Sequence, residues 1–108
     1  MSLYGEYIYE REGKNIIEDQ ESFATYKIHG TECYIEDVYV QKEARKNVKA
    51  HKIVDRIAEI AKEQGAKFLT TTVSTIVGNP TASVRAILGY GFRVHSAKEN
   101  LIVFIKEV

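Results

Sequence analysis

The segment Cys33–Lys67, CYIEDVYVQKEARKNVKAHKIVDRIAEIAKEQGAK, contains the two elements that decide the fold. Its first part, Cys33–Val40, is rich in β-branched and aromatic residues and predicts a strand. From Ala50 to Ala61 apolar residues recur every three or four positions, which predicts an amphipathic helix that Gly65 is placed to cap. A strand followed by a short polar loop and a long helix is the first half of a β-α-β unit.

The sequence on either side predicts the remaining elements. Phe23–Ile28 is a second β-rich run, and His29–Thr31 suits a hairpin that pairs it with the strand above. In the run Glu6–Glu10, tyrosines alternate with other residues, which predicts an N-terminal strand that turns at Glu12-Gly13, with residues 14–18 pairing back onto it. The other expected elements are strands at 67–75, 92–96 and 101–107, a helix at 81–88, and a polar hairpin loop at 97–100.

The order of these elements predicts the fold class. Antiparallel strands come first and a β-α-β crossover follows, so we expect an α/β (α+β) fold with a mixed, mostly antiparallel sheet and two main helices. The 108 residues correspond to one domain, and residues 1–108 are expected to form a single unit.

Composition excludes several classes of protein. A lone Cys33 cannot form an internal disulfide, and the sequence shows no charged and apolar leader, so we expect a cytoplasmic protein with a buried, inert thiol. The longest apolar run, Leu101–Ile105, is too short to cross a membrane. His29 and His95 have no partner at metal-ligand spacing, so no metal site is expected.

Charge is balanced overall but uneven along the chain. The 15 basic and 15 acidic residues argue against nucleic-acid binding by bulk charge. Residues 1–37 carry nine acidic and three basic side chains, whereas residues 38–67 carry eight basic and four acidic ones. The pattern suits a cationic ligand near the N-terminal third and an anionic one in the middle, or else is a random scatter on solvated faces.

The start of the predicted helix is a candidate anion site. First-turn amides have no partner within a helix and, with the positive end of the helix dipole, attract anions. Basic side chains surround this helix start, although the helix dipole favours acidic residues there. A departure from such a local preference often marks a functional site. The basic residues are Lys42, Arg45, Lys46, Lys49 and Lys52.

Two motifs resemble those of the GCN5-related N-acetyltransferase (GNAT) family. Arg45–Ala50, RKNVKA, stands at the helix start as motif A of that family does, with the pattern Arg/Gln-x-x-Gly-x-Gly/Ala. Asn79–Arg85, NPTASVR, followed by Gly91-Phe92, is similar to motif B. The stretch Ile35–Val38 is similar to that of the glucosamine-6-phosphate acetyltransferases, and the whole resemblance covers residues 22–108.

The resemblance implies a compact acyl-CoA N-acyltransferase fold with shortened N-terminal elements, and acetyl-CoA as cosubstrate without a metal. Its pyrophosphate would lie on the amides of Arg45–His51, and its pantetheine arm would add like a strand to Val38–Val40. The cofactor-binding residues implied are Val38, Tyr39, Val40, Arg45, Lys46, Asn47, Val48, Lys49, Ala50, His51, Asn79 and Arg85.

The implied reaction is direct attack of a primary amine on the thioester, with a backbone amide near Tyr39 stabilising the oxyanion. Glu36 is the candidate base, through water, or is simply one of the sheet's solvated acids. Asp37 is the second choice, because strand alternation points it to the opposite face. The acceptor would be a small-molecule or protein amine, and a homodimer is expected.

The sequence departs from the family pattern at two positions. Val48 replaces the first glycine of motif A, and Ile87 stands where many members carry a tyrosine that protonates the leaving thiolate. Tyr90 lies nearby as a candidate substitute. Both departures favour an alternative, a catalytically degenerate module that binds CoA or a protein partner. An RNA-binding α/β domain is a third reading, which lacks the net positive charge and the usual pattern of basic and aromatic residues.

Overall fold

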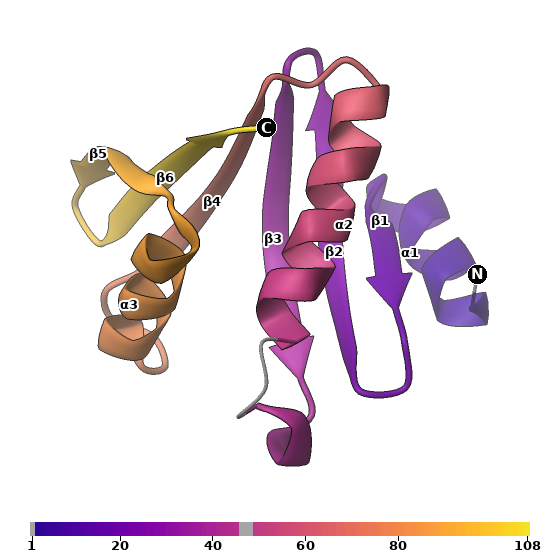
Figure 1. Cartoon of the computed structure of the whole chain (residues 1–108), viewed down its shortest axis with the longest axis horizontal. Coiled ribbons are helices and arrows are strands. Elements are labelled where there is room, and N and C mark those ends of the chain that lie inside the picture. Colours follow the sequence, from indigo (N-terminus) through magenta and orange to yellow (C-terminus); the bar gives the residue numbers. More distant parts are fainter. Residues whose placement is uncertain (1, 46–48) are drawn as a thin grey trace.

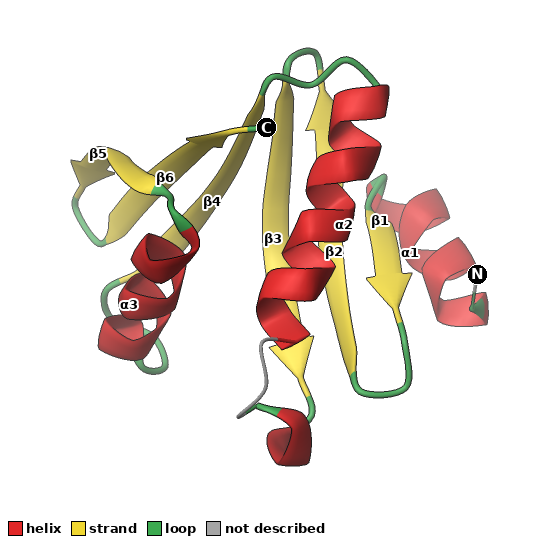
Figure 2. Cartoon of the chain, in the orientation of Figure 1, coloured by secondary structure: helices red, strands yellow, loops and turns green. Residues whose placement is uncertain are grey.

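The computed structural model describes residues 2–45 and 49–108. Strands precede the long crossover helix, and a strand, a second helix and two more strands follow it, as the sequence predicts (Figures 1 and 2). In chain order they are α1 Leu3–Glu12, β1 Asn15–Glu18, β2 Ser22–His29, β3 Glu32–Val40, a 3-10 turn Lys42–Ala44, α2 Lys49–Glu63, β4 Phe68–Ser74, α3 Pro80–Tyr90, β5 Arg93–Lys98 and β6 Leu101–Glu107.

The six strands form one sheet in the order β1-β2-β3-β4-β6-β5. All neighbouring strands are antiparallel except β3 and β4, which the α2 crossover makes parallel. The expected mixed, mostly antiparallel sheet with two main helices, α2 and α3, is confirmed.

Helix α2 supplies the centre of the core. Its residues Ile53, Ile57 and Ala61 lie one above another on one face, as their spacing predicts, and all three are buried. They pack in one cluster with buried side chains of the sheet. The sheet residues of this cluster include Ile17, Ala24, Tyr26, Cys33, Ile35, Leu69, Val73 and Phe104.

Strands β3 and β4 stay paired over only three residues each. Glu32, Cys33 and Tyr34 pair with Phe68, Leu69 and Thr70, and after this point the two strands diverge (Figure 1). The sheet is therefore splayed beside α2 and α3.

The N-terminal run is a helix and not the predicted strand. The Ser2 hydroxyl accepts a hydrogen bond from the Gly5 amide at 3.0 Å, and Gly13, with φ 69°, ends α1. Only Gly5 and Ile8 of the helix are buried, so the alternating tyrosines did not mark a strand face. Residues 15–18 consequently pair with β2.

Smaller differences lie near the C-terminus. Helix α3 continues through Gly89 to Tyr90, and β5 begins at Arg93 instead of Phe92. The β5–β6 loop consists of Glu99 and Asn100 and is therefore shorter than the predicted loop at 97–100. No helix of the described chain is long and apolar enough to cross a membrane.

Replacing Ile57 by alanine tests whether α2 is the centre of the core. Because the Ile57 side chain is fully buried, we expect Ile57→Ala to lower the free energy of unfolding by about 2 to 5 kcal/mol, measured by urea denaturation. Glu59→Ala, at an exposed position of the same helix, is the control and should change it by less than about 0.5 kcal/mol. Equal effects of the two variants would contradict this packing.

Candidate active site

The divergence of β3 and β4 opens a cavity of about 560 Å³ between the sheet, α2 and α3. Its walls come from β3, β4, α2 and α3 and from the segments that follow β4 and α3. The lining residues are Ile35, Glu36, Asp37, Val38, Ala50, His51, Val54, Thr71, Thr72, Val73, Ser74, Val77, Ser83, Ala86, Ile87, Tyr90 and Phe92. The cavity is large enough to hold an organic ligand.

A β-bulge at Glu36 shapes the β3 wall of this cavity. Thr25 pairs with Asp37 whereas Tyr26 pairs with Ile35, so Glu36 is an extra residue without a partner in β2. A bulge of this kind redirects the side chains next to it. It interrupts the alternation that was expected to send Asp37 to the opposite face, and both acidic residues line the cavity.

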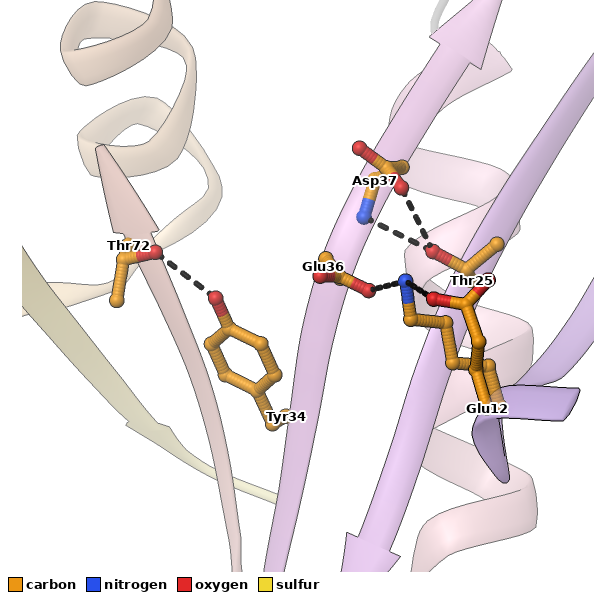
Figure 3. A network of polar contacts seen from close by, with 7 residues as sticks. Glu12, Thr25, Tyr34, Glu36, Asp37 and Thr72 are labelled. Carbon is orange, nitrogen blue, oxygen red and sulfur yellow. Dashed lines mark hydrogen bonds and ion pairs between the residues drawn. The ribbon is translucent and has the colours of Figure 1, made fainter. Parts of the chain in front are cut away.

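The Glu36 carboxylate forms an ion pair with Lys14 (Figure 3). The Lys14 Nζ lies 2.5 Å from Glu36 Oε2 and 3.1 Å from Glu12 Oε1. Hydrogen bonds to Glu36 and then to Glu12 raise the pKa of the Lys14 ammonium well above its ordinary value. Lys14 is therefore a protonated cation that two carboxylates contact at the edge of the candidate site.

Asp37 is bound to the neighbouring strand instead. The Thr25 hydroxyl donates to Asp37 Oδ2 at 3.1 Å and accepts from the Asp37 amide at 3.2 Å (Figure 3). Thr25 is buried, so this pair of hydrogen bonds fixes the strand on the far side of the bulge. Of the two carboxylates, Glu36 is the one held by a charged group.

Where β3 and β4 diverge, side-chain hydrogen bonds from threonines of β4 take the place of main-chain hydrogen bonds between the strands. The Thr71 hydroxyl donates to the Ile35 carbonyl at 2.9 Å, and the hydroxyls of Tyr34 and Thr72 lie 2.9 Å apart (Figure 3). The sequence favours Thr71 and Thr72 only as residues that form strands, and it did not predict that their hydroxyls bond to β3 in the cavity wall. The one sequence signal for these bonds is three consecutive threonines in a strand next to the crossover.

Tyr90 closes the α3 side of the cavity. Its phenol donates a hydrogen bond to Asp55 of α2, and its ring meets His51 edge-on with centroids 5.1 Å apart. Burial, followed by the bond to the Asp55 carboxylate, raises the pKa of Tyr90 well above its ordinary value. Ile87, on the same helix, lines the cavity with an apolar side chain.

Nine of the predicted cofactor residues divide into three groups. Val38, Ala50 and His51 line the cavity, whereas Lys46, Asn47 and Val48 lie outside the described residues, as does the Lys49 side chain. Asn79 accepts from the Ala82 amide at the start of α3, and Arg85 lines a separate hollow on that helix.

The end of β3 binds the Arg45 side chain. Arg45 Nε donates to the Val40 carbonyl at 2.9 Å, and the guanidinium lies 5.5 Å from the centre of the Tyr39 ring. Tyr39 in turn stacks on Phe23 at 5.7 Å. These contacts place a cation at the β3 end of the crossover loop.

The sequence comparison names the family. Residues 8–86 match the sequence model of the acetyltransferase (GNAT) family. The chain belongs to the GNAT family. No curated protein matches it significantly, and the glucosamine-6-phosphate type stays a prediction.

Solved GNAT structures share the fold at low sequence identity. PaiA N-acetyltransferase from Thermoplasma acidophilum, in complex with coenzyme A, has 15% identity and a TM-score of 0.77, covering 98% of this chain and 69% of its own. A GNAT-family acetyltransferase from Elizabethkingia anophelis with acetyl-CoA bound has 13% identity and a TM-score of 0.73, covering 99% and 84%. A GNAT-family protein from Desulfovibrio desulfuricans has 12% identity and a TM-score of 0.77, covering 94% and 75%.

Two other expectations concern metal and sulfur. Over residues 2–45 and 49–108, no group of three or more His, Cys, Asp or Glu side chains could hold a metal ion. Cys33 is fully buried as expected, and burial raises the pKa of its thiol to about 11.

The raised pKa of Tyr90 predicts a pH-dependent stability. Above about pH 10 the unfolded chain loses the Tyr90 phenol proton while the folded chain keeps it. The contribution of Tyr90 to the free energy of unfolding is therefore complete below about pH 10 and is lost as the pH rises through the folded-state pKa. Urea denaturation between about pH 10 and 12 should therefore show a steeper fall in wild type than in Tyr90→Phe. Tyr4→Phe, at an exposed phenol, is the control, and identical slopes for wild type and Tyr90→Phe would contradict the assignment.

Proposed function

We propose that this GNAT-family chain transfers an acetyl group from acetyl-CoA to a primary amine by direct attack in a ternary complex. The observation that carries the proposal is the parting of β3 and β4. Beyond Tyr34, the described part of β3 has no pairing with β4, so its edge faces the cavity. Thr71 and Arg45 hold the carbonyls of Ile35 and Val40. The main-chain groups between these two residues can bind an extended arm. The relatives with CoA or acetyl-CoA bound support this choice of cosubstrate.

The residues around the cavity suit acetyl-CoA. Val38–Val40 would bind the pantetheine arm through their main chain, and the start of α2, with Ala50 and His51, would face the pyrophosphate. The Arg45 guanidinium at the end of β3 adds positive charge on that side. Lys46, Asn47, Val48 and Lys49 would contribute to the same pyrophosphate site, and Asn79 and Arg85 would contact the cosubstrate from the start of α3 and from α3 itself.

The proposed chemistry is a direct acyl transfer. The amine nitrogen forms a bond to the thioester carbonyl carbon, the C–S bond breaks, and CoA leaves as a thiolate. A backbone amide near Tyr39 would stabilise the oxyanion, and Glu36 would take the amine proton, with Asp37 as the second candidate. Tyr90 would protonate the thiolate only after its phenol turns away from Asp55.

A second candidate function is binding without turnover. Ile87 presents an apolar side chain to the cavity, and the Tyr90 phenol is already bonded to Asp55. Both facts favour a module that binds CoA or a protein partner and lacks an acid for the thiolate. For either function we propose a cytoplasmic, single-domain protein that forms a homodimer. Size-exclusion chromatography with light scattering tests the homodimer.

Thermal unfolding tests the cosubstrate. Acetyl-CoA at 100 times its dissociation constant should stabilise the fold by about 2.7 kcal/mol, which raises the midpoint of a domain of this size by about 10 °C or more. Adenosine at the same concentration is the control and should give no comparable shift. The absence of a shift at millimolar acetyl-CoA would reject the proposed cosubstrate.

Glu36→Gln tests the proposed base. Because a positioned base contributes roughly 100-fold or more to a rate, we expect kcat for an amine acceptor to fall about 100-fold, measured by release of the CoA thiol. The acetyl-CoA thermal shift should be retained. Glu107→Gln, at an exposed position of β6, is the matched control; an unchanged kcat in Glu36→Gln would remove Glu36 from this role.

A further inference from the structure

Lys14 lies where its ammonium contacts the Glu36 carboxylate. It follows Gly13, whose left-handed conformation ends α1, and precedes β1. Its side chain is only 14% exposed, whereas that of its partner Glu36 is 37% exposed. The carboxylate is thus within reach of solvent and ligands while one of its oxygens is bound to a cation of the chain itself.

This cation has the same chemistry as the proposed substrate. A primary ammonium on Lys14 contacts Glu36 at 2.5 Å and Glu12 at 3.1 Å. An acceptor amine that arrives protonated would seek the same carboxylate, because Glu36 both attracts the cation and receives its proton in the proposed reaction. Two ammonium groups bound to one carboxylate would lie close together and repel each other, so Lys14 weakens the binding of a second cation there.

We propose that Lys14 is a specificity-determining residue of the acceptor site: its ammonium holds the substrate's place on Glu36, and only a cationic amine displaces it. The inference rests on the proposed function. Charge carries the selectivity, since a neutral alcohol offers the carboxylate no cation in exchange for Lys14. Asp37 lines the same cavity and adds a second negative charge, which disfavours acceptors with an anionic group beside the amine.

Binding of a simple amine tests the displacement without turnover. The probe is n-butylamine at neutral pH, titrated into the ¹⁵N-labelled full chain, with the dissociation constant taken from the amide shifts of residues 36 and 37. Partly exposed ion pairs contribute up to about 1 kcal/mol, so Lys14→Met should bind the probe up to about fivefold tighter than wild type. Lys14→Arg, which keeps a cation at the site, should bind it as weakly as wild type.

Two controls isolate the effect of position from that of charge. Lys27→Met removes the same charge from an exposed position of β2 and should leave the dissociation constant unchanged. n-Butanol, a neutral analogue of the probe, should not bind any variant measurably. Equal affinity of wild type and Lys14→Met, or equal gains in Lys14→Met and Lys27→Met, would overturn the proposal.

Turnover distinguishes a failure of this inference from a failure of the proposed reaction. With acetyl-CoA present, the gain in kcat/KM of Lys14→Met for n-butylamine should come from a lower KM. If the binding results hold and no variant releases the CoA thiol, the displacement stands and the proposed acetyl transfer is rejected. If Lys14→Met does not fold, Lys14→Gln and Glu12→Gln, which loosens Lys14 by removing its second partner, give the same comparison.

Discussion

The early end of the β3–β4 pairing is the constraint on which the rest of the site depends. Only three residue pairs join the two central strands, and side-chain bonds from Thr71 and Thr72 replace the ladder just beyond them. If pairing continued along β3, the free edge and the cavity between α2 and α3 would both be lost. The centre of the sheet therefore lacks main-chain hydrogen bonds that strands normally form there, and the cavity occupies the space between the two strands.

The bulge at Glu36 connects this cavity to the N-terminal part of the chain. It lies at the start of the unpaired edge, and its carboxylate is held by Lys14, which follows α1. The N-terminal helix is thus more than a cover for the sheet, because its last turn supplies Glu12 to the same ion-pair network. In the proposed function, the cosubstrate on one side and the acceptor amine on the other would meet at this residue of β3.

Much of the fold was predictable because its signals are local. The period of Ile53, Ile57 and Ala61 fixed α2, and the crossover then required a mixed sheet. The N-terminal helix was missed, because its alternating tyrosines fit a strand and its Ser2 and Gly13 caps lie outside that run. The bulge, the Lys14–Glu36 pair and the threonine bridges depend on strand register and on contacts between distant residues, which sequence periodicity does not contain.

Hydrogen exchange of the full chain with and without acetyl-CoA tests the central claim, that the unpaired edge of β3 is the cosubstrate site. An arm bound along this edge covers amides that have no partner in β4. The account predicts slower exchange in peptides covering residues 35–40 and 49–54, with little change in β5, whose residues are all exposed. Protection confined to the hollow beside Arg85, or to β5 and β6, would contradict it.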